Sequence, residues 1–255
     1  MLDTVDFNHV QHISFAQSRL TDAVSVILSE SLSYEHPPKW MECFLWIHRK
    51  VRFWMFEINS RSAAIDNDFI NHLAETRIED DKLVCILGKL FSAVEMEAIM
   101  HPLVYDNELP KNNQRVMRLF QDEVVHRVDF SDITGDIDAK KQYYAFLVKN
   151  FYFELLGEEF PESDERIPYH WKARSSLGEI HTCAMCLLCG CLIFLSDDRD
   201  SRELARIIEQ KNMCSIKVYN RKALIKDYKA RNLGNDEENY ISRDDLHALG
   251  HAIRS

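Results

Sequence analysis

The sequence predicts an α/β protein with three α/β/α layers around a central parallel sheet, preceded by a helical N-terminal extension. Short apolar runs alternate with longer segments of helical periodicity, which is typical of parallel strands connected by helices. Only seven Gly and six Pro occur in 255 residues, which favours long helices over many short strands joined by tight turns. Apolar residues make up 46% and charged residues 28%, as expected for a globular protein with a large core.

The first block of the chain, residues 1–59, differs in character from the rest. Residues 7–30 and 40–58 each carry an apolar helical pattern, and a pair of prolines separates them. The extension contains no catalytic or ligand-binding motif, so it is expected to pack against the domain or bind a partner. The α/β domain is expected over residues 60–232, followed by a polar C-terminal tail over 233–255.

The α/β domain begins with a short apolar run at residues 63–65 that ends in an acidic turn, Asp66-Asn67-Asp68. This pattern is typical of a buried strand that gives way to a helix. Later strands are expected at 97–101, 124–130, 191–195 and 214–219. Helices are expected at 82–94, 104–108, 138–157, 176–190 and 202–211. Residues 157–174 are polar, contain two prolines and are expected to form a loop.

The net charge of −10 excludes a protein that coats nucleic acid with its whole surface. It does not exclude a metal-dependent nuclease, because a metal-binding pocket is itself acidic and the metal supplies the positive charge that a phosphate needs. Further contacts to phosphates would come from local basic residues, of which the candidates are Lys172, Arg174, Arg199 and Arg202. Their alternative role is to solvate helix faces.

Two acidic residues follow predicted strands directly. Asp66 comes after the run at 63–65, and Asp198 comes shortly after the run at 191–195. Active sites of open parallel sheets form beyond the carboxyl ends of the strands, where these two residues would meet. Two carboxylates at close range repel each other unless a cation lies between them, and Mg²⁺ and Mn²⁺ prefer such oxygen ligands.

Over roughly residues 60–225 the chain resembles the PIN family of metal-dependent nucleases. Four pieces occur in the family's order, and each carries an acid at Asp66, Glu108, Glu179 or Asp198. The pieces are Ala64-Ile65-Asp66-Asn67-Asp68-Phe69, Pro102-Leu103-Val104-Tyr105-Asp106-Asn107-Glu108-Leu109, Leu177-Gly178-Glu179 and Phe194-Leu195-Ser196-Asp197-Asp198-Arg199-Asp200-Ser201-Arg202. The roughly 70 residues between Glu108 and Glu179 exceed what a compact PIN domain needs, and the loop at 157–174 could serve as a lid or partner site.

The resemblance implies a Mg²⁺- or Mn²⁺-dependent phosphodiesterase, namely an endoribonuclease that cleaves single-stranded RNA. Members of the family often act as toxins held in check by an antitoxin, so an inhibitory protein partner or a homo-oligomer is expected. Four acids would be both catalytic and metal-binding: Asp66, Glu108, Glu179 and Asp198. Ser196 would orient a ligand or water, and Asp68 and Asp200 are auxiliary acids.

Three other functions stay open. The domain could be a PIN-fold interaction module with little catalysis, a nuclease specific for DNA structures, or a phosphatase-like Mg²⁺ hydrolase. Each acid also has a simpler interpretation. Glu179 could belong to a capping box with Ser176, Asp66 and Asp198 could cap helices or stabilise turns, and Glu108 could be an exposed helical residue.

The seven cysteines indicate reduced thiols and a cytoplasmic protein, because their number is odd and four fall in one apolar run. The spacing of Cys183, Cys186, Cys189 and Cys191 is similar to that of iron–sulfur ligands, but the apolar setting favours packing. The longest apolar run, residues 183–195, is too short to span a membrane, and no signal peptide precedes the domain. His247 and His251 could share a helix face, though a third ligand is not evident.

Overall fold

The computed structural model of the protein describes residues 61–160, 176–211, 213–231 and 238–250. The predicted helical extension over 1–59 lies outside these ranges, as do His251 and most of the predicted loop at 157–174. The boundaries of the predicted α/β domain, 60–232, therefore stay a prediction.

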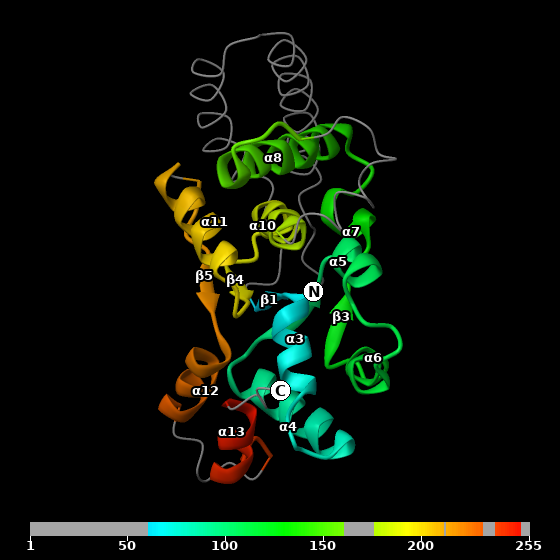
Figure 1. The fold of residues 1–255 in the computed structure, drawn as a ribbon, viewed down its shortest axis with the longest axis vertical. Helices are drawn as coiled ribbons and strands as arrows, with labels where there is room; N and C mark the ends of the chain where they lie inside the picture. The colour runs from blue at the N-terminus through cyan, green and yellow to red at the C-terminus, as the bar shows by residue number, and fades with distance from the viewer. Residues whose placement is uncertain (1–60, 161–175, 212, 232–237, 251–255) are drawn as a thin grey trace, which may run out of the picture.

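Five parallel strands form one sheet in the order β3-β2-β1-β4-β5 (Figure 1). The strands are β1 (Ser62–Ile65), β2 (Glu97–Met100), β3 (Val125–Arg127), β4 (Ile193–Leu195) and β5 (Lys217–Tyr219). The central strand β1 pairs with β2 on one side and with β4 on the other. The predicted α/β class with a parallel sheet is confirmed.

Helices cover both faces of the sheet (Figure 1). One layer contains α5 (Pro102–Asn107), α7 (Phe130–Thr134), α8 (Asp138–Leu156), α10 (Leu177–Cys189) and α11 (Arg199–Gln210). The opposite layer contains α3 (Asn67–Ala74), α4 (Asp80–Ala93), α6 (Gln114–Gln121), α12 (Arg221–Ala230) and α13 (Arg243–Gly250). This arrangement is consistent with three α/β/α layers.

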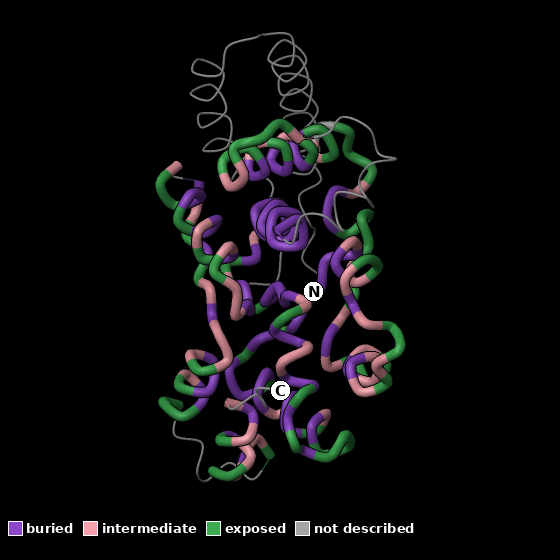
Figure 2. The backbone as a smooth tube through the Cα atoms, viewed as in Figure 1, coloured by how far each residue is buried: buried purple, intermediate pink, exposed green. Residues whose placement is uncertain are grey.

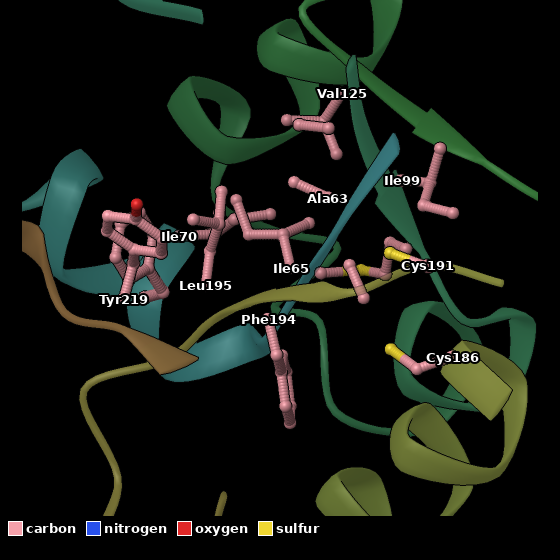
Figure 3. Close-up of a cluster of buried hydrophobic side chains, with 14 of the residues drawn as sticks. Ala63, Ile65, Ile70, Ile99, Val125, Cys186, Cys191, Phe194, Leu195 and Tyr219 are labelled. Carbon is pink, nitrogen blue, oxygen red and sulfur yellow. The ribbon is translucent and has the colours of Figure 1, made fainter. Parts of the chain in front are cut away.

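The elements β1 and α10 are buried along their whole length. All four residues of β1 are buried, as expected for the central strand of a sheet covered on both faces. Every residue of α10 is also buried, because this helix lies between the sheet and α8 (Figure 2). Cys186 and Cys191 lie among these apolar side chains (Figure 3), and the cysteines of the described ranges form no disulfide. No described helix combines the length and apolarity that a membrane crossing needs.

Several element boundaries differ from the prediction. The strand expected at 124–130 ends at Arg127, and Phe130 instead begins α7, because Asp129 and Asp132 form a capping box there. The helix expected from 202 begins at Arg199. Two helices that the sequence did not predict, α6 and α12, follow cap residues whose side chains accept backbone hydrogen bonds.

Candidate active site

The candidate site lies at the carboxyl edge of the sheet, where β1 and β4 end side by side. Ile65 is paired with Leu195 in the parallel register. The backbone N–H of Asp66 donates to the carbonyl of Leu195 at 3.0 Å, and that of Ser196 donates to the carbonyl of Tyr219 at 3.0 Å. Each strand therefore continues its hydrogen bonding by one residue, which brings Asp66 beside Ser196.

Hydroxyl groups hold the buried carboxylate of Asp66. Ser196 Oγ donates to Asp66 Oδ2 at 2.9 Å, and Ser201 Oγ donates to Ser196 Oγ at 2.7 Å. The backbone N–H of Asp198 also donates to Ser196 Oγ, at 3.1 Å. Asp66 precedes α3, but its side chain makes no capping hydrogen bond. Asp66 is therefore the N-cap residue of α3 by position only, and its carboxylate accepts from Ser196 instead.

The surroundings of Asp66 disfavour its charged form. Removal from water by burial raises the pKa of its carboxyl from 3.8 to about 7. The negative charges of Asp68 and Asp198 contribute to the rise, while hydrogen bonds from Ser196 and the backbone of Asn67 oppose it. A nearby cation would reverse this balance, because it favours the ionised carboxylate.

Glu179 lies in the first turn of α10 and is 6% exposed. Burial, followed by the charge of Asp66, raises the pKa of Glu179 to about 9, and Glu108 and Asp198 add smaller repulsions. Its Oε2 atom is buried and has no hydrogen-bond partner among the described residues.

The capping-box alternative for Glu179 is not observed. Ser176 precedes α10 without a side-chain capping hydrogen bond, and its Oγ instead donates to Asp200 Oδ2 at 2.6 Å. A box would need the Ser176 hydroxyl at the start of α10, so this contact to α11 removes one of its two hydrogen bonds. The Ser176 half of the predicted capping box is therefore absent.

Glu108 ends α5 and is half-buried, with its carboxylate beside the start of α10. A Cβ atom at Gly178 would lie 2.5 Å from Glu108 Oε1 and 2.9 Å from Oε2. An added Cβ at Gly178 would therefore require the flexible end of the Glu108 side chain to shift. Gly178 thus lets two acids, Glu108 and Glu179, approach each other from different helices.

The remaining predicted acids, Asp198, Asp200 and Asp68, are less buried than Asp66 and Glu179. Asp198 is half-buried and caps α11, because its Oδ1 accepts the N–H of Asp200 at 2.8 Å. The cap interpretation is therefore correct for Asp198, and its charge still acts on Asp66 and Glu179. Asp200 holds Ser176, while Asp68 is exposed.

The predicted phosphate-binding residues are only partly described. Arg199 and Arg202 are exposed on the first turn of α11, next to Asp198. Lys172 and Arg174 lie outside the described ranges. Arg199 is the described candidate that follows Asp198 directly in the chain.

A charged group beside the acids was not predicted. Asp197 Oδ2 accepts from Arg221 Nε at 2.5 Å and lies 3.2 Å from His72 Nδ1. Asp197 Oδ1 also accepts the backbone N–H of Arg221, at 3.1 Å. The sequence offered only the acidic run Asp197-Asp198 as a sign of this group. The partners of Asp197, His72 on α3 and Arg221 on α12, are distant in the sequence.

The acids suit a hard divalent cation by their chemistry. Asp66, Glu179, Glu108 and Asp198 carry carboxylate oxygens, the ligand type that such a cation prefers, and Glu179 Oε2 is buried without a partner among the described residues. Within the described ranges, however, no three Asp, Glu, His or Cys side chains form a group that could hold a metal ion. We expected Asp66, Glu179 and Asp198 to share one metal ion. In the described residues their side chains do not form such a group.

Comparison of the chain with protein-family models, curated proteins and solved structures gives no match. The resemblance of the four acidic segments to the PIN family therefore stays a prediction from the sequence. The α/β fold and the mutual repulsion of the acids are the independent structural observations beside it.

Proposed function

We propose that the protein is a Mg²⁺- or Mn²⁺-dependent phosphodiesterase of the PIN type that cleaves single-stranded RNA. Asp66, Glu108, Glu179 and Asp198 would hold the metal. One observation carries the proposal: Asp66 and Glu179 are the two buried acids of the described residues, and they are neighbours that repel each other. Buried charges are ordinarily paired or bound to metal, because an unpaired buried charge is costly.

Neither buried acid has a basic partner in the described part of the chain: no salt bridge there includes Asp66 or Glu179. In the metal-free protein at neutral pH, Glu179 retains a proton, since its pKa is raised to about 9. A divalent cation would take the place of that proton and provide the missing positive charge.

The chain's own residues would orient and position the reacting groups. Ser196 holds Asp66 Oδ2, and Ser201 fixes the Ser196 hydroxyl, so the carboxylate has a defined orientation. Arg199 is exposed beside Asp198 and is available to a substrate phosphate. A bound Mg²⁺ would lower the pKa of a water molecule and neutralise charge that develops on the phosphate.

The test is a substrate screen with short single-stranded RNA, single-stranded DNA and a chromogenic phosphate ester. We expect RNA to be cleaved in Mg²⁺ or Mn²⁺ and to stay intact in EDTA. Asp66→Asn should abolish cleavage, while Asp244→Asn is the matched control because Asp244 is an exposed acid on α13. Cleavage that persists in EDTA, or in Asp66→Asn, would contradict the proposal.

The same screen separates the alternatives. Preference for DNA would favour a DNA nuclease, turnover of the ester alone would favour a phosphatase-like hydrolase, and no turnover with any metal would favour an interaction module. Inhibition by a protein partner, self-association and a cytoplasmic location stay predictions from the sequence.

A further inference from the structure

Three buried polar side chains form a continuous chain of hydrogen bonds close to the acids in the fold. Tyr144 Oη lies 2.8 Å from His101 Nε2 and 2.6 Å from His181 Nδ1. His101 is fully buried, and His181 and Tyr144 are buried too. The rings of His101 and Tyr144 are also stacked, with centroids 6.0 Å apart and an interplanar angle of 5°. We call this group the His–Tyr–His chain.

The partners determine where the protons lie in the His–Tyr–His chain. The backbone N–H of Leu103 donates to His101 Nδ1 at 3.1 Å, so this nitrogen is an acceptor. Burial lowers the pKa of His101 and lowers that of His181 to about 3, so both rings are neutral at physiological pH. Neutral His101 therefore carries its proton on Nε2 and donates to Tyr144, whose hydroxyl then donates to His181 Nδ1.

The His–Tyr–His chain connects the two helices that deliver Glu108 and Glu179. His101 follows β2 and caps α5, the helix that ends at Glu108. His181 lies on α10, two residues after Glu179. Tyr144 reaches both histidines from α8, which packs across α10 (Figure 1). The hydroxyl of one tyrosine thus fixes α5 and α10 relative to each other.

The start of α10 and the end of α5 lie close together at the acids. Glu108 Oε1 already lies 2.5 Å from the point where a Cβ of Gly178 would stand, directly before Glu179. A shift of α10 against α5 would therefore change the separation of the two carboxylates. Metal sites tolerate such shifts poorly, because their ligands must be held to within about 0.5 Å.

We propose that Tyr144 is a positioning residue for the metal site: its hydroxyl, through His101 and His181, holds Glu108 and Glu179 at the separation that a shared divalent cation needs. This inference rests on the proposed function and deepens it. Tyr144 does not touch the metal or substrate and acts only through the two histidines.

Tyr144→Phe isolates the hydroxyl, because it retains the ring that packs between the histidines. Loss of the hydroxyl leaves two buried ring nitrogens without this partner and should lower stability whether or not metal is present. If Tyr144 positions the metal site, Tyr144→Phe should also lower the affinity for metal. The two effects separate in thermal unfolding measured in EDTA and at increasing Mn²⁺ concentration, because a ligand that binds the folded state raises Tm according to its Kd.

The matched control is Tyr152→Phe, which removes the same hydroxyl from the same helix outside the His–Tyr–His chain. Tyr152 is 1% exposed and packs edge-on against Phe160, with ring centroids 5.2 Å apart. We expect Tyr144→Phe to weaken the Kd for Mn²⁺ by about tenfold, as loss of an outer-shell contact typically does, and Tyr152→Phe to stay within about twofold of the parent.

Each other outcome overturns a specific statement. If Tyr144→Phe melts earlier in EDTA but binds Mn²⁺ with the affinity of the parent, the His–Tyr–His chain only stabilises the fold and the inference is wrong. An equal loss of Mn²⁺ affinity in Tyr152→Phe would assign the effect to α8 as a whole and overturn it as well. If the parent itself shows no Mn²⁺-dependent rise in Tm, the proposed metal site fails and the inference fails with it.

Discussion

Replacement of Asp66 by asparagine should stabilise the metal-free protein and abolish metal-dependent cleavage. Asparagine keeps the shape of the side chain and an oxygen that can accept from Ser196 Oγ, but it carries no charge. A pKa raised from 3.8 to about 7 corresponds to about 4 kcal/mol against the ionised form, at about 1.36 kcal/mol per pH unit. Because the buried amide has a desolvation cost of its own, we expect a gain of about 2–4 kcal/mol at pH 8.

The gain should depend on pH in a defined direction. The folded pKa of Asp66 lies above its unfolded value, so metal-free folded protein binds a proton between about pH 4 and pH 7 that the unfolded chain releases. The contribution of Asp66 to stability is therefore complete below pH 4 and is lost as pH rises to about 7. The difference in Tm between Asp66→Asn and the parent should be small near pH 4 and largest above pH 7.

Thermal unfolding in EDTA from pH 4.5 to pH 8, together with RNA cleavage in Mn²⁺ at pH 8, measures both effects. One kcal/mol corresponds to about 2–4 °C in a protein of this size, so the variant should melt at least about 4 °C above the parent at pH 8. Asp244→Asn controls for the general loss of one negative charge. If Asp66→Asn instead melts earlier at pH 8 and still cleaves RNA, Asp66 is a structural acid and the proposed mechanism is wrong.

Three further predictions concern Glu179, Gly178 and the cysteines. Mn²⁺ binding at pH 7.5 should release protons, because the pKa of Glu179 is raised to about 9. The affinity for Mn²⁺ should also increase as the pH rises toward 9. A weakly buffered titration with an indicator dye that shows no proton release would contradict this prediction. Gly178→Ala should lower cleavage at least about tenfold, since its Cβ would displace the Glu108 carboxylate; activity within twofold of the parent would show that this carboxylate moves freely. Purified protein should contain no stoichiometric zinc or iron, and Cys186→Ala should keep activity within a few fold, as elemental analysis and the RNA assay can check.

The elements that the sequence predicted best are those in which local pattern and burial agree. The apolar residues of β1 precede Asp66 directly, and those of β4 precede Ser196, so the carboxyl edge of the sheet could be predicted from two short segments. Helix α12 was missed because its buried apolar residues, Leu224, Ile225 and Tyr228, are few and lie among many charged ones. The end of β3 was misplaced because the capping box that starts α7 was not recognised.

The roles of the acids depended on contacts between distant parts of the chain. The sequence allowed Glu179 to be either a capping residue or a site residue. The capping box is disfavoured by Ser176, whose hydroxyl bonds to Asp200 on another helix. The position of Glu108 against Gly178 joins residues 70 apart in the sequence. No periodicity or spacing encodes such contacts, so the sequence could nominate these acids but could not show how they meet.

The position of Glu179 explains how the fold tolerates an acid in its core. Most residues of α10 are apolar, and the helix is buried on every side. An apolar residue at position 179 would therefore avoid the cost of removing a carboxylate from water. Departures from such a local rule are expected mainly at functional sites. Glu179 lies in the first turn, where the helix dipole favours a negative charge and offsets part of the desolvation cost. The helix therefore supports an ionised Glu179 once a cation balances Asp66, which is the state that the proposed reaction requires.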